Sequence, residues 1–326
     1  MGAAWEGLGG ERQQGGGGER AEWAREGHAG SLRGRRGHGK WPGAVVHAVR
    51  LLRTMSRRSI PFALVLPLVA GCDGVPLQWE PAAPVAGEPL ATWSHPPIPA
   101  AAMPVDARGI RCDASLRLAR RAGTDVMAAW WVVRPDSTAV LLAARGNVLL
   151  EGDQHGRSPR RVTGATWEPA LPVDTLDRGT HGCARPAPAI VFEPRTGYVH
   201  VSYAMDAPEG TGVFFAHSMD AGRMWHSPVS IVYGPRLAAT AIAARGDTVA
   251  IAYEDPNSAD PPQVALALSV TAGHIFEHKS IPVSAGAHAA VGPEVAFEAS
   301  GAIVAGWRER RPDGEVAMRR RATWAR

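Results

Sequence analysis

The sequence contains few cysteines, few tyrosines and little helical periodicity. Its 326 residues include three cysteines and four tyrosines. Neither the spacing of the cysteines nor the histidines near them suggests a metal site, so we expect no metal, and we expect no cofactor. Helical periodicity is hard to find from residue 108 onward, whereas alternating apolar residues are frequent there. These absences favour an all-β fold for the larger part of the chain.

Residues 55–71 have the organisation of a secretory signal. A short cationic stretch at 55–59 precedes an apolar run at 60–68 that is too short to span a bilayer as a mature helix. The small residues 69–71 and Cys72 resemble a bacterial lipobox, in which the cysteine receives lipid and becomes the mature N-terminus. The resemblance implies an exported lipoprotein, anchored in the bacterial cell envelope on its periplasmic or outer face. The alternative is a buried core strand of a longer domain.

Residues 1–54 are rich in glycine and arginine, with runs at 15–18 and 33–36. They lack apolar periodicity and cannot bury enough surface to offset the entropy of ordering. We expect this segment either to be disordered or to be an over-extended gene prediction, with translation starting at Met55. Residues 72–107 are rich in proline and alanine, which predicts a semi-extended tether.

The basic character of the chain belongs to its N-terminal part. Of 35 Lys/Arg and 31 Asp/Glu, nine and five respectively lie in residues 1–54, and the signal adds Arg57 and Arg58. The predicted mature protein therefore keeps 24 basic and 26 acidic residues. A nucleic-acid-binding protein would need a basic face on its folded domain, so we expect no nucleic-acid partner. We also expect the protein to be monomeric.

Residues 108–326 contain four similar units. Each has a glycine turn followed by an alternating apolar strand that ends in an aromatic residue, then a turn with proline and aspartate, then a third strand. The glycines are Gly123, Gly197, Gly246 and Gly301, and the aromatic residues are Trp130, Tyr203, Tyr253 and Trp307. This order predicts a β-propeller built from four-stranded antiparallel blades.

One octapeptide supports the repeat. Ser218, Asp220, Gly222 and Trp225 resemble the Asp-box of sialidase-type β-propellers, Ser-x-Asp-x-Gly-x-x-Trp. Residues 269–276 keep its serine, glycine and a final aromatic, and residues 164–167 keep only a glycine and an aromatic. The resemblance covers residues 108–326 and implies that the four Asp-box residues are structural. The family usually has six blades, whereas four are recognisable here and little room remains for a fifth or sixth.

The outermost strand of the last unit is missing from its expected place, because the chain ends where that strand should begin. Residues 79–85 nearly repeat residues 167–173, which we assign to an outer fourth strand. We therefore expect residues 79–86 to supply the missing strand and to tie the ends of the ring together. The alternative is a proline-rich linker that matches by chance.

Cys112 and Cys183 precede the glycine turns of adjacent units by similar distances. They should occupy comparable innermost-strand positions, so a disulfide is geometrically reasonable in an oxidising compartment. The alternative is two unpaired buried thiols.

The sialidase resemblance implies three arginines that hold a substrate carboxylate, a tyrosine–glutamate nucleophile pair and an aspartate acid/base. The family's Arg-Ile-Pro signature is absent, and Arg111, Arg185 and Arg236 are the candidate ligand-binding arginines. Tyr203 and Tyr253 align with tryptophans and are expected to pack, so no catalytic residue is identified. We favour a membrane-tethered binding module for a protein or glycan partner. The alternative is an exo-sialidase that hydrolyses sialosides.

Overall fold

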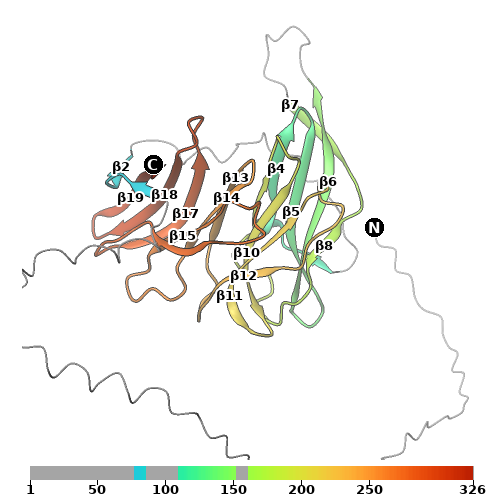
Figure 1. Ribbon diagram of the computed structural model, residues 1–326. Coiled ribbons are helices and arrows are strands. Elements are labelled where there is room, and N and C mark those ends of the chain that lie inside the picture. Colours follow the sequence, from blue (N-terminus) through green and yellow to red (C-terminus); the bar gives the residue numbers. More distant parts are fainter. Residues whose placement is uncertain (1–76, 86–108, 152–160, 326) are drawn as a thin grey trace, which may run out of the picture. The chain divides into compact units, whose positions relative to one another are not determined.

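The computed structural model of the chain describes residues 77–85, 109–151 and 161–325 (Figure 1). The expected N-terminal extension at 1–54, the expected signal peptide at 55–71, Cys72 and most of the expected tether lie outside these residues. None of the described residues forms a helix long and apolar enough to cross a membrane.

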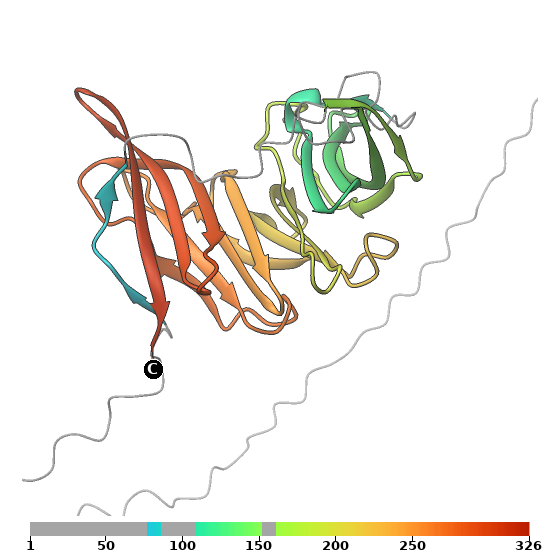
Figure 2. The same cartoon turned by 90° about the horizontal axis from the view of Figure 1, so that it is seen from above.

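The described chain is all-β, as predicted, and its strands pair antiparallel in four sheets that we call blades 1 to 4. Blade 1 contains β3 (Ile110–Arg111), β4 (Arg117–Ala122), β5 (Asp125–Val133), β6 (Ala139–Glu151), β7 (Arg161–Trp167) and β8 (Leu171–Asp174), with the 3₁₀ helix η2 (Asp113–Ser115) between β3 and β4. Blade 2 contains β9 (Ala189–Phe192), β10 (Val199–Ala207), β11 (Gly210–Ser218) and β12 (Val229–Tyr233). Blade 3 contains β13 (Thr240–Arg245), β14 (Thr248–Glu254), β15 (Val264–Ser269) and β16 (His278–Pro282). Blade 4 contains β17 (Ala289–Phe297), β18 (Ile303–Arg311) and β19 (Gly314–Trp324), joined by β1 (Leu77–Trp79) and β2 (Ala83–Pro84). In Figures 1 and 2 the colours run from green in blade 1 to red in blade 4.

The predicted glycine turns are confirmed in every blade. Each glycine lies in the hairpin between the first and second long strand, at a positive φ of 56° for Gly123, 75° for Gly197, 59° for Gly246 and 88° for Gly301. A Cβ is disfavoured in this region of backbone space, so glycine is the residue that forms these hairpins without strain. We call these four turns the first hairpins.

The predicted aromatic residues of the second strands are also confirmed as packing residues. Trp130, Tyr203 and Tyr253 are fully buried, and Trp307 is almost so. Burial of one such ring stabilises the fold by about 1.5–3 kcal/mol. These rings therefore mark the interior of each blade and fix which face of the strand turns inward.

The cores lie mainly between neighbouring blades. One buried cluster joins strands of blades 1 and 2, a second joins blades 2 and 3, and a third joins blades 3 and 4. Trp131 of β5 meets Tyr203 of β10 edge to face, with ring centroids 5.9 Å apart. Each sheet is thus buried against the next one along the chain.

The near-repeat of residues 79–85 and 167–173 corresponds to two matching pairs of outer strands. In blade 1, β7 ends at Trp167 and β8 follows, and both pair with β6. In blade 4, β1 ends at Trp79 and β2 follows, and both pair with β19. Figure 1 shows β2, in cyan, beside the red β19. The segment that precedes the repeats by sequence thus supplies the outer edge of blade 4.

The register of the two outer pairs is the same. Trp167 lies opposite Gly146 and Trp79 lies opposite Ala322. The next backbone amide donates 2.8 Å hydrogen bonds in both blades, from Glu168 to Arg145 O and from Glu80 to Arg321 O. The internal sequence repeat is therefore a repeat of strand pairing.

One expected Asp-box remnant is wrong. Gly164 and Trp167 lie within β7 and pair with Leu149 and Gly146 of β6, with one register shift beside Gly164, so they do not form a turn before the fourth strand. A glycine followed by an aromatic is too short a signal to separate a turn from a strand.

Candidate functional site

A cavity of about 570 Å³ is lined by strands from all four blades. Its walls come from β4, β9, β13 and β17, the first long strand of each blade. Most of the lining is aliphatic or aromatic, and it includes Leu118, Ile190, Ile242, Val295 and Phe297. Three arginines also line the cavity where these strands approach the first hairpins, namely Arg120, Arg195 and Arg245.

Two of the three lining arginines are available to a ligand. Within the described residues, the side chains of Arg120 and Arg195 make no ion pair or hydrogen bond. Arg245 instead donates hydrogen bonds to Glu298 O at 3.4 Å and Ala299 O at 2.8 Å, which connects blade 3 to the first hairpin of blade 4. The cavity therefore combines apolar walls with two unpaired guanidinium groups.

The acidic residues of the cavity are occupied by the protein itself. Glu193 accepts hydrogen bonds from the backbone amides of Arg195 and Thr196 and, across the blade boundary, from that of Gly246 at 3.0 Å. Burial alone would raise the pKa of Glu193, but these hydrogen bonds outweigh it and lower the pKa. Glu298 pairs with Arg321 at 3.0 Å. Glu193 therefore stays ionised near neutral pH and holds two hairpins together.

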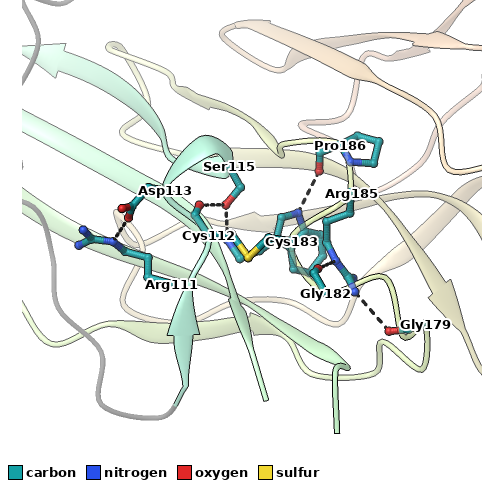
Figure 3. The surroundings of a disulfide bond; sticks show 10 residues. Arg111, Cys112, Asp113, Ser115, Gly179, Gly182, Cys183, Arg185 and Pro186 are labelled. Atoms are coloured by element: carbon teal, nitrogen blue, oxygen red, sulfur yellow. Dashed lines mark hydrogen bonds and ion pairs between the residues drawn. A yellow bond between two sulfur atoms is a disulfide. The ribbon is translucent and has the colours of Figure 1, made fainter. Parts of the chain in front are cut away.

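Arg185 is a structural residue, so its assignment as a ligand-binding arginine is wrong. Its side chain has no exposed surface, and its Nη1 lies 2.9 Å from a carboxylate oxygen of the equally buried Asp177. Its Nε donates to Gly182 O and its Nη2 to Gly179 O, while the guanidinium lies 5.1 Å from the ring centroid of Trp131. Figure 3 shows this side chain beside the disulfide.

The other two candidate arginines also lie outside the cavity lining. Arg111 is paired with Asp113 at 2.5 Å (Figure 3). Arg236 follows blade 2 and donates to Asp255 O at 3.0 Å and to Ser258 Oγ at 3.3 Å in a turn of blade 3. The three lining arginines share a local sequence feature, because Arg120, Arg195 and Arg245 each lie one to three residues before the glycine of a first hairpin.

The structure joins Cys112 and Cys183 by a disulfide with a Cα–Cα distance of 5.3 Å. Cys112 lies just after β3, and Cys183 lies in the connection between β8 and β9. Both residues therefore lie before the cavity-lining strands of their blades, and the expected position within an innermost strand is wrong. The bond ties blade 1 to the start of blade 2.

The tyrosines are not arranged as a nucleophile pair at the cavity. Tyr203 donates a 2.5 Å hydrogen bond to Asp174 and Tyr253 donates one to Lys279 O, and burial raises the pKa of both phenols, that of Tyr253 to about 12. Tyr233 is exposed on the outer strand β12. All four tyrosines lie among the described residues, and none lines the cavity.

The octapeptide forms the turn between β11 and β12. Ser218 donates to Asp220 Oδ1 at 2.7 Å and accepts the amide of Gly222 at 2.8 Å, while Asp220 accepts the amide of Met224 at 2.8 Å. Trp225 packs against the core cluster between blades 1 and 2. The side chains of Ser218 and Asp220 thus bind the turn, and that of Trp225 packs on the core.

The degenerate octapeptide forms an equivalent turn between β15 and β16. Ser269 accepts the amide of Gly273 at 3.1 Å, and Thr271 Oγ1 accepts the amide of Ile275 at 3.0 Å in place of a carboxylate. Phe276 packs edge to face on Phe215 of blade 2, with centroids 5.0 Å apart. Both turns therefore place an aromatic ring against the preceding blade.

Four histidines gather where these two turns meet. His217 stacks on His226 with centroids 4.4 Å apart and meets His274 edge-on at 4.7 Å, and the fully buried His200 lies 6.2 Å away. Burial and the neighbouring histidines lower the pKa of His200 to about 3 and that of His217 to about 4. Within the described part of the chain, no group of His, Cys, Asp and Glu has the arrangement of a metal site.

The sequence matches no protein-family model, and no curated protein matches it. Among solved structures, it is similar to the Hadza microbial sialidase Hz136, with 16% identity, a TM-score of 0.42 and coverage of 63% of this chain and 43% of that one. A Trypanosoma rangeli sialidase in complex with the inhibitor DANA has 8% identity, a TM-score of 0.36 and coverage of 64% and 44%. A protein of unknown function from Dyadobacter fermentans has 14% identity, a TM-score of 0.42 and coverage of 66% of each chain. The chain spans less than half the length of either sialidase, and it is structurally similar to sialidase-type β-propellers.

Proposed function

We propose that this protein is an exported, lipid-anchored β-propeller that acts as a non-catalytic binding module. The observation that carries the proposal is the cavity, whose apolar walls come from all four blades and whose guanidinium groups of Arg120 and Arg195 are unpaired within the described residues. A mostly apolar cavity with a few polar groups is typical of a ligand site.

The two arginines indicate the chemistry of the ligand. A guanidinium binds a carboxylate through two parallel hydrogen bonds, and such charge-assisted pairs are stronger than neutral ones. The apolar walls favour a ligand with an apolar face beside its anionic group. We therefore expect the cavity to take a carboxylate-bearing group of a protein or glycan partner.

Two further features support export with lipid attachment and a non-catalytic role. A disulfide between Cys112 and Cys183 is typical of a protein outside the cytosol, which agrees with the signal at residues 55–71 and with lipid attachment at Cys72. The phenols of Tyr203 and Tyr253 are hydrogen-bonded inside the fold, which disfavours a tyrosine nucleophile at the cavity.

The proposal is tested by affinity capture from detergent-solubilised bacterial envelopes, using wild-type protein, the double variant Arg120→Ala/Arg195→Ala and the control Arg236→Ala. We expect the wild type and the control to retain the same partner and the double variant to lose it. Equal capture by all three proteins would contradict the proposed site. A fluorogenic sialoside should not be hydrolysed, and turnover that depends on Arg120 and Arg195 would instead establish the sialidase alternative.

A further inference from the structure

The first hairpins and the Asp-box turns lie at one end of the blades. Within each sheet, the start of the second strand pairs with the end of the third, as Val199 does with Ser218 and Val249 with Ser269. Neighbouring first hairpins contact each other, since the amide of Gly246 donates to Glu193. In blade 4, Trp324 Nε1 donates to Gly301 O of the first hairpin. We call this end the Asp-box face.

Exposed apolar side chains are concentrated on the Asp-box face. Met224 is 71% exposed and Ile275 is 62% exposed, values typical of a side chain that projects into solvent. Six of the ten large apolar residues with high exposure among the described residues lie at this face: Leu149, Met219, Met224, Val270, Ile275 and Trp324. A concentration of exposed apolar residues at one face is typical of a surface that contacts a membrane or a protein partner.

The two Asp-box turns expose the same positions. Met219 and Val270 follow the first serine of their turns, and Met224 and Ile275 precede the final aromatic. The serine that opens each turn is fully buried and accepts the amide of the turn glycine, whereas these four positions face solvent. Polar residues would be tolerated there without loss of the turn, yet all four positions are apolar.

The predicted lipid would be attached at this same face. Leu77 pairs with Trp324, so the described chain begins at the Asp-box face. Cys72 lies five residues before Leu77, which limits the lipid to within about 18 Å of the face because an extended chain spans at most about 3.6 Å per residue. Residues 77–85 are strands of blade 4, so they cannot act as part of a long tether that lifts the domain from a membrane.

We propose that the Asp-box face of this protein lies on a lipid bilayer, with Met219, Met224, Val270, Ile275 and Trp324 at the level of the headgroups. The proposal rests on the proposed lipid attachment at Cys72. The charged residues of this face are mixed, with Arg195, Arg223 and Arg245 beside Asp247 and Glu277, all of them exposed. Contact therefore depends on apolar insertion rather than on anionic lipid. Arg195 also lines the cavity, so a ligand that enters at this end comes from the membrane side.

The test uses the lipidated full-length protein in phosphatidylcholine vesicles that carry a quencher on the upper acyl chain. Met224→Cys introduces a single reactive thiol, because Cys112 and Cys183 are joined and Cys72 is acylated, and this thiol takes a polarity-sensitive dye. Ile110→Cys is the matched control, since Ile110 is 72% exposed and pairs with Val133 at the opposite end of β5.

We expect a blue shift and a loss of fluorescence for the dye at position 224, and neither change at position 110. Mass spectrometry of the same preparation shows whether Cys72 carries lipid. With the lipid present, an unquenched dye at position 224 overturns this inference alone, and it is the result expected if a protein partner covers the face instead. An unmodified Cys72 overturns both the inference and the anchor on which it rests.

Discussion

The two Asp-box turns have different sequences and nearly the same backbone. Residues 218–225 contain the complete signature, whereas residues 269–276 have threonine for aspartate and phenylalanine for tryptophan. In both turns an alanine followed by a glycine takes positive φ, at 59° and 88° in the first turn and 55° and 84° in the second. The two turns therefore share a serine at the first position, a short oxygen-bearing side chain at the third, a glycine at the fifth and an aromatic ring at the eighth.

The largest expected difference between the turns concerns their glycines. A Cβ at Gly222 would lie against the mobile end of Met127, whereas a Cβ at Gly273 would lie against the ring of Phe215. Because the ring cannot move as freely, we expect Gly273→Ala to lower the free energy of unfolding by about 3 kcal/mol and Gly222→Ala by about 2 kcal/mol, from strain and overpacking together. Urea unfolding measures the loss of stability in both variants. Equal losses would show that Phe215 moves aside as easily as Met127 and would contradict the expected difference.

A smaller effect is expected from pH, through the histidines between the turns. The pKa of His217 is lowered to about 4 by burial and by His226 and His274. Between about pH 6.5 and 4 the unfolded chain binds the proton more readily than the folded one, so stability falls as the pH falls through this range. We expect a loss on the order of 2 kcal/mol from His217.

The control for this effect is His217→Phe, which keeps a ring beside Phe215 and removes the titrating group. Its unfolding free energy should vary less between pH 7 and pH 4 than that of the wild type, because the contribution of His217 is removed. The same slope in both proteins would exclude His217 as the cause.

Removing the side-chain oxygen at the third position should affect the complete turn more than the degenerate one. Asp220→Ala removes a charge-assisted hydrogen bond to the amide of Met224 and should cost about 1 kcal/mol. Thr271→Val removes the neutral counterpart to Ile275 and should cost about 0.5 kcal/mol. Thermal unfolding of both variants measures the loss of stability. A larger loss for Thr271→Val than for Asp220→Ala would contradict this prediction.

The smallest effect is expected from restoring the signature. Thr271→Asp should raise stability by about 0.3 kcal/mol, because a carboxylate accepts the Ile275 amide more strongly but lies near the exposed Asp247 and Glu277. The exchange in the other turn, Asp220→Thr, is the matched control and should lower stability. Calorimetry should therefore give changes in unfolding free energy of opposite sign for the two variants. A loss of stability in both would mean that each turn is adapted to its own residue.

Local patterns in the sequence were sufficient to predict much of the fold. Gly123, Gly197, Gly246 and Gly301 act on their own hairpins, so their role can be inferred from neighbouring residues alone. The near-repeat of residues 79–85 could be assigned to an outer strand because its counterpart at 167–173 lies in a complete blade. The prediction of an Asp-box remnant at Gly164 is wrong, because Gly164 pairs with Leu149 of β6. The local pattern of a glycine followed by an aromatic residue does not indicate this strand pairing.

The site was harder to predict, because the role of an arginine depends on partners distant in sequence. Arg185 differs from Arg195 by its burial against Asp177 and Trp131, which no local pattern indicates. Arg236 is bound by carbonyl groups of the following blade, whereas Arg120 and Arg195 reach the cavity by the strand positions they occupy. The position of these arginines before a hairpin glycine indicates a shared site only once β4, β9, β13 and β17 are known to line one cavity.

Mass spectrometry of the protein extracted from bacterial membranes tests the central claim most directly. The account predicts a mature polypeptide that begins at an acylated Cys72 and contains a bond between Cys112 and Cys183. A chain that retains unmodified residues before Cys72 and has two free thiols at these positions would contradict it.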